Sequence, residues 1–314
     1  MLDLAAAILS AAAPATTAIL LAAMGCLVNR QGGIVNIGLE GLMLGGAFAA
    51  VAASAAAASW QAGVAAAGAV GALLGLGFSW TITRLGANQI IAGLGLNLVV
   101  LGFLGYLLPV RFGVQGTYLP EGVVGLPRIA LPLLGNMPLL GPILSPQTPL
   151  TYASWLTIPV IAFVLYRTAW GIALRAAGED EEAARAAGVP ALRWRDVSTV
   201  VAGLLSGLAG AHLALGVVTL FNKNMTAGRG FIALAAVYFG AARPWPTAAA
   251  AFLFGIFEAA SFRYGSAGLA PQLVQMLPYL VVVISLTLVA LRRRWDVRRR
   301  AARAADLASI GGAR

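Results

Sequence analysis

Residues 37–58, IGLEGLMLGGAFAAVAASAAAA, hold one ionisable side chain, Glu40, in an otherwise apolar and small-residue run. A helix that crosses the hydrocarbon core of a bilayer needs about 20 such residues, so this stretch predicts a membrane-spanning helix. The rest of the chain is similar, because 60% of its 314 residues are hydrophobic, 10% are charged and the mean hydropathy is +0.86. Soluble domains have about 25% charged residues, so a soluble globule is excluded.

Apolar runs recur along the whole chain and predict an all-α integral membrane protein with about nine transmembrane helices, within a range of eight to ten. The seventh run is short, and we expect its helix to begin nearer Met225. These helices form a single transmembrane domain over residues 1–291, followed by a basic tail over 292–314. The expected spans are Leu4–Val28, Ile37–Ala58, Ala62–Ile82, Ile90–Leu107, Pro149–Tyr166, Val197–Val217, Phe231–Ala242, Pro246–Phe262 and Leu273–Leu291.

The net charge of +10 is carried by basic residues in short loops and in the tail. Such residues mark the cytoplasmic side of membrane proteins, so they predict topology and not binding to nucleic acid. We expect a cytoplasmic C-terminus, an external N-terminus, an outer loop over 109–147 and a cytoplasmic loop over 167–196. With one His and one Cys, the chain predicts no Cys-rich metal cluster and no intrachain disulfide.

The two longer loops differ in composition. The outer loop is rich in Pro and Gly with short apolar stretches, and it has room for a re-entrant or interfacial helix. Residues 178–190 of the inner loop predict a short helix, because acidic residues open it, Gly188 suits its C-terminal cap and Pro190 follows as a stop. A rigid cytoplasmic projection of this kind suits contact with a soluble motor subunit; a solvated connector is the alternative.

Glu40 lies in the segment Asn36-Ile37-Gly38-Leu39-Glu40-Gly41, where Gly38 and Gly41 weaken the helix. Ionisable groups and freed backbone groups at membrane depth are tolerated when they are buried in protein or line a wet cavity. The pattern therefore predicts a broken helix beside a translocation path. The alternative places Glu40 near the cytoplasmic interface, where it caps a helix or pairs with an Arg.

A second interrupted segment contains Thr226, Gly228, Arg229 and Gly230. Aligning Glu40 with Arg229 also aligns Gly41 with Gly230, and the two segments run in opposite directions across the predicted membrane. This relation is typical of an inverted repeat, although the Gly/Ala bias of both segments leaves a chance match open. A direct Glu40–Arg229 ion pair is a further, less favoured hypothesis.

Other polar side chains lie within predicted spans. Asn97 follows Asn88 and Gln89 in the fourth span, and it faces either a polar pathway or a neighbouring helix. His212 is interpreted as a packed, hydrogen-bonded histidine, with a proton relay as the alternative. Glu258 raises the same question and has no evident partner in the sequence.

The sequence lacks three common motifs of ATP-binding proteins, zinc enzymes and serine hydrolases. It contains no Gly-x-x-x-x-Gly-Lys-[Ser/Thr] phosphate loop, no His-Glu-x-x-His and no Gly-x-Ser-x-Gly. The chain is therefore not expected to be an enzyme or to bind ATP in the P-loop manner.

Three stretches carry a resemblance to a known family: residues 33–47, residues 175–189 and residues 224–235. They resemble the permease subunits of bacterial ATP-binding-cassette importers in the branched-chain amino acid, ribose and nucleoside group. The Asn-Ile-Gly-x-Glu-Gly and Asn-Met-Thr-x-Gly-Arg-Gly-Phe motifs are most similar to the nucleoside branch. That branch works with a binding lipoprotein of the basic membrane protein type.

The resemblance implies a permease in the bacterial inner membrane that moves nucleosides or related nucleobase compounds inward. Its expected partners are an ABC ATPase subunit, which holds ATP and Mg, a second paralogous permease in a heterodimer, the extracytoplasmic lipoprotein and membrane lipid. No cofactor is expected on this chain. The alternatives are an ion-coupled secondary transporter, or the same importer type for a simple sugar or a branched-chain amino acid.

The resemblance also assigns two groups of residues. The helix Glu179–Ala187 would be the coupling helix that seats in the ATPase, and the interrupted segments would line the path. The coupling residues are Gly178, Glu179, Glu182, Ala183, Ala184, Gly188 and Arg193, and the path residues are Asn36, Gly38, Glu40, Gly41, Asn97, Thr226, Gly228, Arg229 and Gly230.

Overall fold

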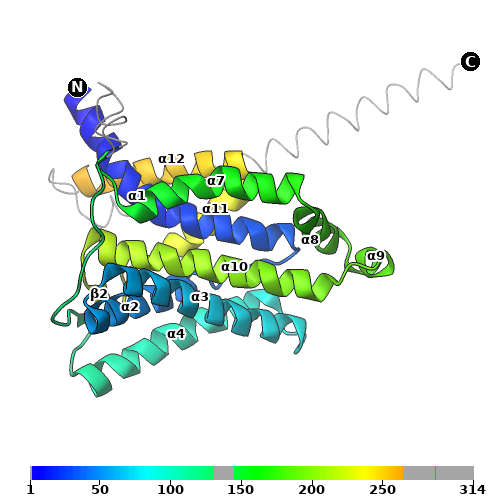
Figure 1. The fold of residues 1–314 in the computed structure, drawn as a ribbon, viewed down its shortest axis with the longest axis horizontal. Coiled ribbons are helices and arrows are strands. Elements are labelled where there is room, and N and C mark those ends of the chain that lie inside the picture. Colours follow the sequence, from blue (N-terminus) through cyan, green and yellow to red (C-terminus); the bar gives the residue numbers. More distant parts are fainter. Residues whose placement is uncertain (1, 131–144, 265–286, 288–314) are drawn as a thin grey trace, which may run out of the picture.

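Long apolar helices dominate the molecule, a computed structural model that describes residues 2–130, 145–264 and 287 (Figure 1). Within these residues, helices form where the long apolar runs occur, because a helix satisfies its own backbone hydrogen bonds in lipid. One two-stranded sheet and a short π-helix, η1, complete the described elements. In chain order they are α1 (Leu2–Gln31), α2 (Leu39–Ala57), α3 (Trp60–Thr83), α4 (Gln89–Phe112), β1 (Thr117–Tyr118), α7 (Pro149–Arg167), α8 (Ala169–Glu179), α9 (Glu181–Ala186), α10 (Ala191–Ala211), η1 (His212–Val217), β2 (Phe221–Asn222), α11 (Arg229–Phe239) and α12 (Pro244–Tyr264).

Six of the described helical segments are long and apolar enough to cross a membrane: α1, α2, α3, α4, α7 and α10 with η1. The shorter α11 and the 21-residue α12 occupy the places of the expected seventh and eighth spans. The all-α membrane fold is thus confirmed. The expected ninth span and the basic tail lie outside the described residues.

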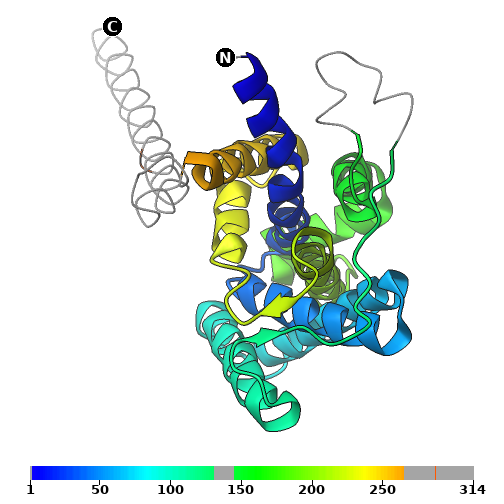
Figure 2. The same ribbon diagram turned by 90° about the vertical axis from the view of Figure 1, so that its left-hand side faces the viewer.

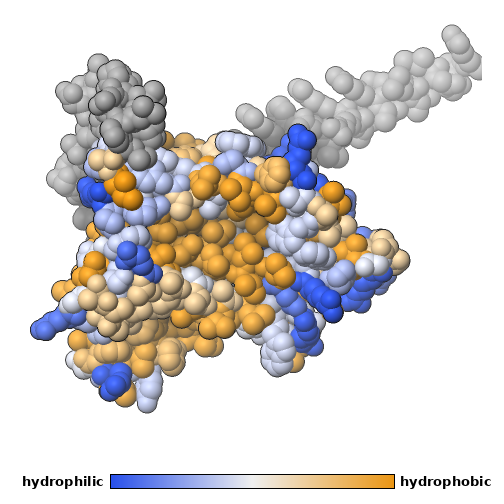
Figure 3. Space-filling view, viewed as in Figure 1, coloured by the Kyte–Doolittle hydropathy of each residue, from blue (hydrophilic) through white to orange (hydrophobic). Residues whose placement is uncertain are grey.

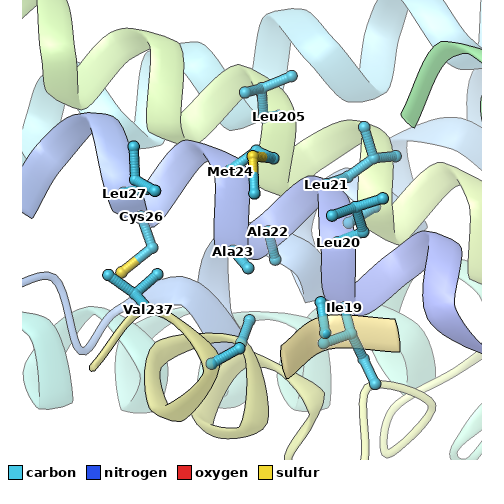
Figure 4. Packing of buried hydrophobic residues seen from close by; sticks show 14 of the residues in the cluster. Ile19, Leu20, Leu21, Ala22, Ala23, Met24, Cys26, Leu27, Leu205 and Val237 are labelled. Atoms are coloured by element: carbon cyan, nitrogen blue, oxygen red, sulfur yellow. The ribbon is translucent and has the colours of Figure 1, made fainter. Parts of the chain in front are cut away.

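Helix α1 is the centre of the bundle, and α7, α10, α11 and α12 pack around it (Figure 2). Its residues Ile19, Leu20, Met24 and Leu27 have no exposed surface. Figure 4 shows these side chains along α1, with Leu205 of α10 beside Met24 and Val237 of α11 beside Cys26. A helix that is apolar all round is typical of such a central position.

Small residues bring α3, α10 and α2 into close contact. The backbone of Gly71 in α3 lies directly against Gly203 and Gly207 in α10, and Gly46 in α2 meets Gly207 from the other side. Lipid provides no hydrophobic force between helices, so close backbone packing of this kind is what holds them together. The alanine- and glycine-rich composition of these spans therefore has a structural role.

The helices form two related sets. α1 packs against α11 and α12, and α10 packs in the same way against α2 and α3, while α1 and α10 cross at the centre. The two central helices run in opposite directions (Figure 1). These contacts are compatible with an inverted repeat, which stays a prediction.

Three boundaries differ from the sequence-based expectations. The seventh helix begins at Arg229 and not near Met225, because Ala227 and Gly228 have φ of 44° and 80°, which breaks a right-handed helix. The sixth span begins at Ala191 and not at Val197. In the expected outer loop, α4 extends to Phe112 and residues 113–130 contain β1 but no helix; residues 131–144 lie outside the described part.

The outer surface has the character of a membrane protein. A broad hydrophobic band lies between more hydrophilic ends in Figure 3. Much of the exposed apolar surface belongs to α4, where Ile91, Leu98 and Val99 are each about two-thirds exposed (71%, 69% and 67%). Such side chains contact lipid or another membrane subunit.

Candidate functional site

The connection between α1 and α2 lies against the first turns of α4. The backbone N–H of Val35 donates to Oε1 of Gln89 (2.8 Å). Asn36 is fully buried, and its Oδ1 accepts a hydrogen bond from the N–H of Gly38 (2.9 Å). Side-chain amides thus satisfy backbone groups that no helix satisfies here.

Asn97 of α4 holds the start of α2 in place. Its Nδ2 donates to the carbonyl of Ile37 (3.0 Å), and its Oδ1 accepts from the N–H of Gly41 (2.7 Å). Contact is close enough that a Cβ on Gly41 would lie 3.0 Å from Cα of Asn97. The predicted cluster of Asn36, Gly38, Gly41 and Asn97 is therefore brought together, with Asn97 fixing the interrupted helix.

Glu40 binds the N-terminus of α11 through both carboxylate oxygens. Its Oε1 accepts from the N–H of Gly228 (2.7 Å) and its Oε2 accepts from the N–H of Gly230 (2.8 Å). The first N–H groups of a helix have no partner within the helix and carry partial positive charge, so the carboxylate both satisfies and neutralises them. Glu40 therefore caps a helix, as one alternative held, but the helix is α11.

The hypothesis of a Glu40–Arg229 ion pair is wrong, because Arg229 pairs with Glu258 of α12. The two side chains are 13% and 9% exposed. Arg229 Nη1 also donates to the carbonyls of Met225 (2.8 Å) and Thr226 (3.3 Å). Glu258, for which the sequence suggested no partner, is thus the counter-ion of the buried arginine.

These contacts form one continuous set, here called the junction: Asn97 of α4, Glu40 and Gly41 of α2, Gly228 to Gly230 at the start of α11, and Glu258 of α12. It links the two halves of the bundle where two helices begin inside the protein. Of the nine predicted path residues, Asn36, Gly38, Gly41, Thr226 and Gly230 are buried, and Glu40, Asn97, Gly228 and Arg229 are partly buried. All nine lie in or directly beside the junction.

His212 is a packed, hydrogen-bonded side chain, as interpreted from the sequence. It is fully buried, with Nε2 at 3.0 Å from the Pro14 carbonyl and Nδ1 at 3.4 Å from Oγ1 of Thr148. A carbonyl accepts only, so Nε2 carries the proton and Nδ1 accepts from the Thr148 hydroxyl. The imidazole connects three helical segments.

The inner loop contains two helices, of which α8 was not expected. Its residues Gly171, Leu174 and Ala177 are buried, and Trp170 meets Trp194 of α10 edge to face with ring centroids 6.1 Å apart. α8 is therefore anchored to the body, and α9 projects beyond it (Figure 1).

Helix α9 has defined caps at both ends. Oδ1 of Asp180 accepts from the N–H groups of Glu182 and Ala183, both at 3.0 Å. At the other end the N–H of Gly188 donates to the Arg185 carbonyl and that of Val189 to the Ala184 carbonyl, both at 2.9 Å. Gly188 has φ of 82°, so this end is a Schellman motif with Gly at the position predicted.

The predicted coupling residues divide into two groups. Glu179, Glu182, Ala183, Gly188 and Arg193 are exposed. Gly178 instead contacts the α1–α2 connection, where a Cβ would lie 2.6 Å from the Gly33 nitrogen, and Ala184 is 5% exposed. Glu181, which was not singled out, pairs with both Arg185 and Arg195 and fixes α9 to α10.

A further ion pair ties α3 to α10 at the same end of the bundle. Arg84 Nη2 lies 2.7 Å from Oδ2 of Asp196, and Ser79 and Thr83 also donate to this carboxylate. The hydrogen bond and charge of Asp196 raise the pKa of the Arg84 guanidinium above its usual value. Sequence reasoning missed Asp196, although an acidic residue at the start of a span is a signal that could have indicated it.

The described residues contain no candidate metal site. None of their His, Cys, Asp and Glu side chains gather in groups of three or more that could hold a metal ion. The polar groups of the junction are engaged with helix ends and with one another. Such a site can position helices and change their packing.

Comparison with known proteins agrees with this architecture. Residues 8–286 match the model of the family described as branched-chain amino acid transport system / permease component. The chain is 32% identical to TsgC13 of Haloferax volcanii, an ABC transporter permease protein named for glucose, over 93% of this chain and 94% of the relative. It is 32% identical to the nucleoside ABC transporter permease protein NupC of Lactococcus lactis over 87% and 89% of the two chains. It is 31% identical to the guanosine ABC transporter permease protein NupQ of Bacillus subtilis over 89% and 92%.

Proposed function

Because the chain belongs to the family of permease components of branched-chain amino acid transport systems, we propose that it is the subunit through which an ABC importer moves nucleosides inward. As an ABC transporter permease component it is not itself catalytic, and ATP hydrolysis takes place on a partner chain. The multi-pass membrane fold agrees with this role.

The nucleoside assignment rests on one observation above others. Two relatives that match most of this chain are named for nucleosides or guanosine. The glucose-named relative, which matches 93% of the chain, supports a simple sugar as the second candidate. Both solute classes carry a polyhydroxylated ring, so uptake must be tested with both.

The junction is our candidate for the moving part of the translocation path. Two helices begin inside the protein there, and the hydrogen bonds that join α2 to the start of α11 are those between the Glu40 carboxylate and two backbone N–H groups. A contact of so few polar groups can break and re-form between two states. We expect the partly buried Glu40, Asn97, Gly228 and Arg229 to border the path, and the buried Asn36, Gly38, Gly41, Thr226 and Gly230 to support them.

Helix α9 is our candidate for the coupling element. Its caps make it rigid, and the Glu181–Arg195 ion pair fastens it to α10, which packs on α1, α2 and α3. A displacement of α9 by the ATPase would therefore move α10 and, through it, the helices at the centre of the bundle. The exposed Glu179, Glu182, Ala183 and Gly188 are expected to meet the ATPase. Arg193, the other exposed residue of the predicted coupling set, lies in the first turn of α10.

The full assembly would contain an ATPase with ATP and Mg, a second paralogous permease and an extracytoplasmic binding lipoprotein in the bacterial plasma membrane. The second permease is expected to cover part of the exposed apolar surface, of which α4 presents the largest share. In this arrangement α9 and the C-terminus lie in the cytoplasm, and the N-terminus and β1 lie outside.

An ion-coupled secondary transporter is the rival function. It would use Glu40, Glu258 or His212 as the coupling group, but each of these is engaged with backbone groups or a buried arginine in this structure. Loss of uptake when the partner ATPase is inactivated distinguishes the importer from this rival.

The decisive experiment is mild purification of the tagged chain from its native membrane, followed by reconstitution with its partners. We expect an ATPase and a second permease to co-purify, and ATP hydrolysis to rise with a guanosine-loaded binding protein but not with glucose. Stimulation by glucose alone would transfer the assignment to sugars. A chain that purifies alone and moves solute without ATP would contradict the importer.

A further inference from the structure

A cavity of about 290 Å³ opens beside α9, at the end of the bundle from which that helix projects. Three arginines from three different elements line it: Arg84 after α3, Arg185 of α9 and Arg193 in the first turn of α10. Its remaining lining is Pro190, Ala191 and Leu192. The cavity therefore has a basic side and a mainly apolar side.

The residues that line the cavity include three arginines and no carboxylate. Arg84 pairs with Asp196 and is 42% exposed, and Arg185 pairs with Glu181 and is 54% exposed. Glu181 is shared with Arg195, so one carboxylate serves two guanidinium groups. Arg193 is exposed and has no acidic partner among the residues that the structure describes. Each guanidinium has five N–H donors, so donors remain for an incoming anion.

An exposed apolar stripe on α3 leads to this cavity. Leu73, Leu76 and Trp80 are 66%, 47% and 57% exposed, and they precede Arg84 at helical spacing of three or four residues. Such a spacing places side chains on one face of a helix. Tryptophan at the end of a span is typical of the lipid–water interface, and basic pockets beside spans bind anionic lipid headgroups.

We propose that the cavity binds the headgroup of an anionic phospholipid, with the phosphodiester on Arg84, Arg185 and Arg193 and an acyl chain along the α3 stripe. Arginine and phosphate form strong, bidentate, charge-assisted hydrogen bonds. An apolar wall and a lipid-facing stripe suit a glycerol backbone and an acyl chain, which a free phosphate lacks. The bound headgroup bridges α3, α9 and α10, and so stiffens the attachment of the coupling helix.

Arg193→Gln is the most direct test, because it removes a guanidinium without releasing a carboxylate from an ion pair. The full chain, delipidated in detergent, is titrated with phosphatidylglycerol or phosphatidylcholine, and bound lipid is counted by native mass spectrometry. We expect phosphatidylglycerol to be retained in preference to phosphatidylcholine, and Arg193→Gln to weaken that retention roughly tenfold, the effect of one charge-assisted hydrogen bond.

The matched control is Arg243→Gln, an exposed arginine between α11 and α12 that does not line the cavity. It should retain phosphatidylglycerol like the parent chain. Equal retention of both lipids, or equal loss in both variants, would overturn the proposal. If millimolar inorganic phosphate displaces the lipid, the proposal of a lipid ligand would be overturned and the cavity would be assigned to a free anion. Unchanged lipid binding, with loss of ATPase co-purification in Arg193→Gln only, would instead assign the cavity to an acidic side chain of the ATPase.

Discussion

At the scale of single residues, the junction shows how a membrane protein accommodates charge. Glu40 places a carboxylate inside the bundle and forms no ion pair within the described part of the chain, and two N–H groups at the start of α11 donate to it instead. The neighbouring Arg229 is balanced separately by Glu258. Glu40 and Arg229 thus lie close to one another, but Glu40 caps α11 whereas Arg229 pairs with α12.

We predict that the Arg229–Glu258 pair behaves as a unit. Arg229→Met and Glu258→Leu alone each leave a buried charge unpaired and should destabilise the chain by about 3–5 kcal/mol, whereas the double variant should recover most of that loss. Thermal unfolding in detergent measures all three. Arg243→Met, an exposed arginine, is the control and should match the parent. A double variant as unstable as the sum of the singles would contradict the prediction.

At the scale of elements, glycine determines how closely helices approach. Gly71 of α3 lies against the Gly203 carbonyl, so a methyl group there must push α3 and α10 apart. Gly77, on the same helix, has no atom within 4 Å of where its Cβ would be. The two positions therefore separate the effect of packing from that of helix propensity.

We predict that Gly71→Ala destabilises the chain by about 1–3 kcal/mol through overpacking. Gly77→Ala should be neutral or stabilising by up to about 1 kcal/mol, since Ala favours the helix over Gly. Thermal unfolding of the two variants side by side provides the measurement. Equal effects would mean that α3 and α10 are not packed through this glycine contact.

The C-terminal cap of α9 gives a test of coupling. Gly188→Val places a β-branched residue at φ of 82°, which strains the Schellman motif, whereas Gly188→Asn tolerates this backbone. We expect Gly188→Val to reduce substrate-stimulated ATP hydrolysis of the assembled transporter at least tenfold, a change of about 1.4 kcal/mol or more. Gly188→Asn should remain close to the parent, with equal amounts of each variant in the membrane. Full stimulation in Gly188→Val would contradict the coupling role of α9.

Elements were more predictable from the sequence than their contacts. Length and hydropathy are local properties, so α2 and α4 appear close to where their apolar runs lie. The start of α11 was misplaced because left-handed backbone at Ala227 and Gly228 depends on the turn that contains them. α8 was missed because it is short, and its buried face is apparent only against α10.

The sequence predicted the members of the junction other than Glu258, but it did not predict how they pair. Glycines that interrupt apolar runs, and isolated charges within those runs, are visible in the sequence. They identified Glu40 and Arg229. Which charge meets which group depends on helix packing, so the sequence could not assign Glu258 to Arg229 or Glu40 to two backbone amides. The pairing of Arg84 with Asp196 was hidden for the same reason.

At the scale of the whole molecule, function depends on which end of the bundle faces the cytoplasm. α8 and α9 are at one end of the bundle, and the paired strands β1 and β2 are at the other (Figure 1). The arginine-lined cavity includes Arg185 of α9 and therefore lies at the α9 end. An importer driven from the cytoplasm needs α9 inside and the strands outside, which the basic residues of the loops also favour.

We predict that two variants, each with one added cysteine, label from opposite sides of the membrane. The native Cys26 is buried at 1% exposure and should not react, so Glu182→Cys on α9 and Asn224→Cys beside β2 report on their own positions, both of which are exposed. A membrane-impermeant maleimide applied to spheroplasts should label Asn224→Cys at once and Glu182→Cys only after lysis. The parent chain, treated with the same maleimide, is the control and should stay unlabelled because Cys26 is buried. The reverse pattern would place α9 outside, where no cytoplasmic ATPase could reach it, and would contradict both the topology and the coupling role argued from the structure.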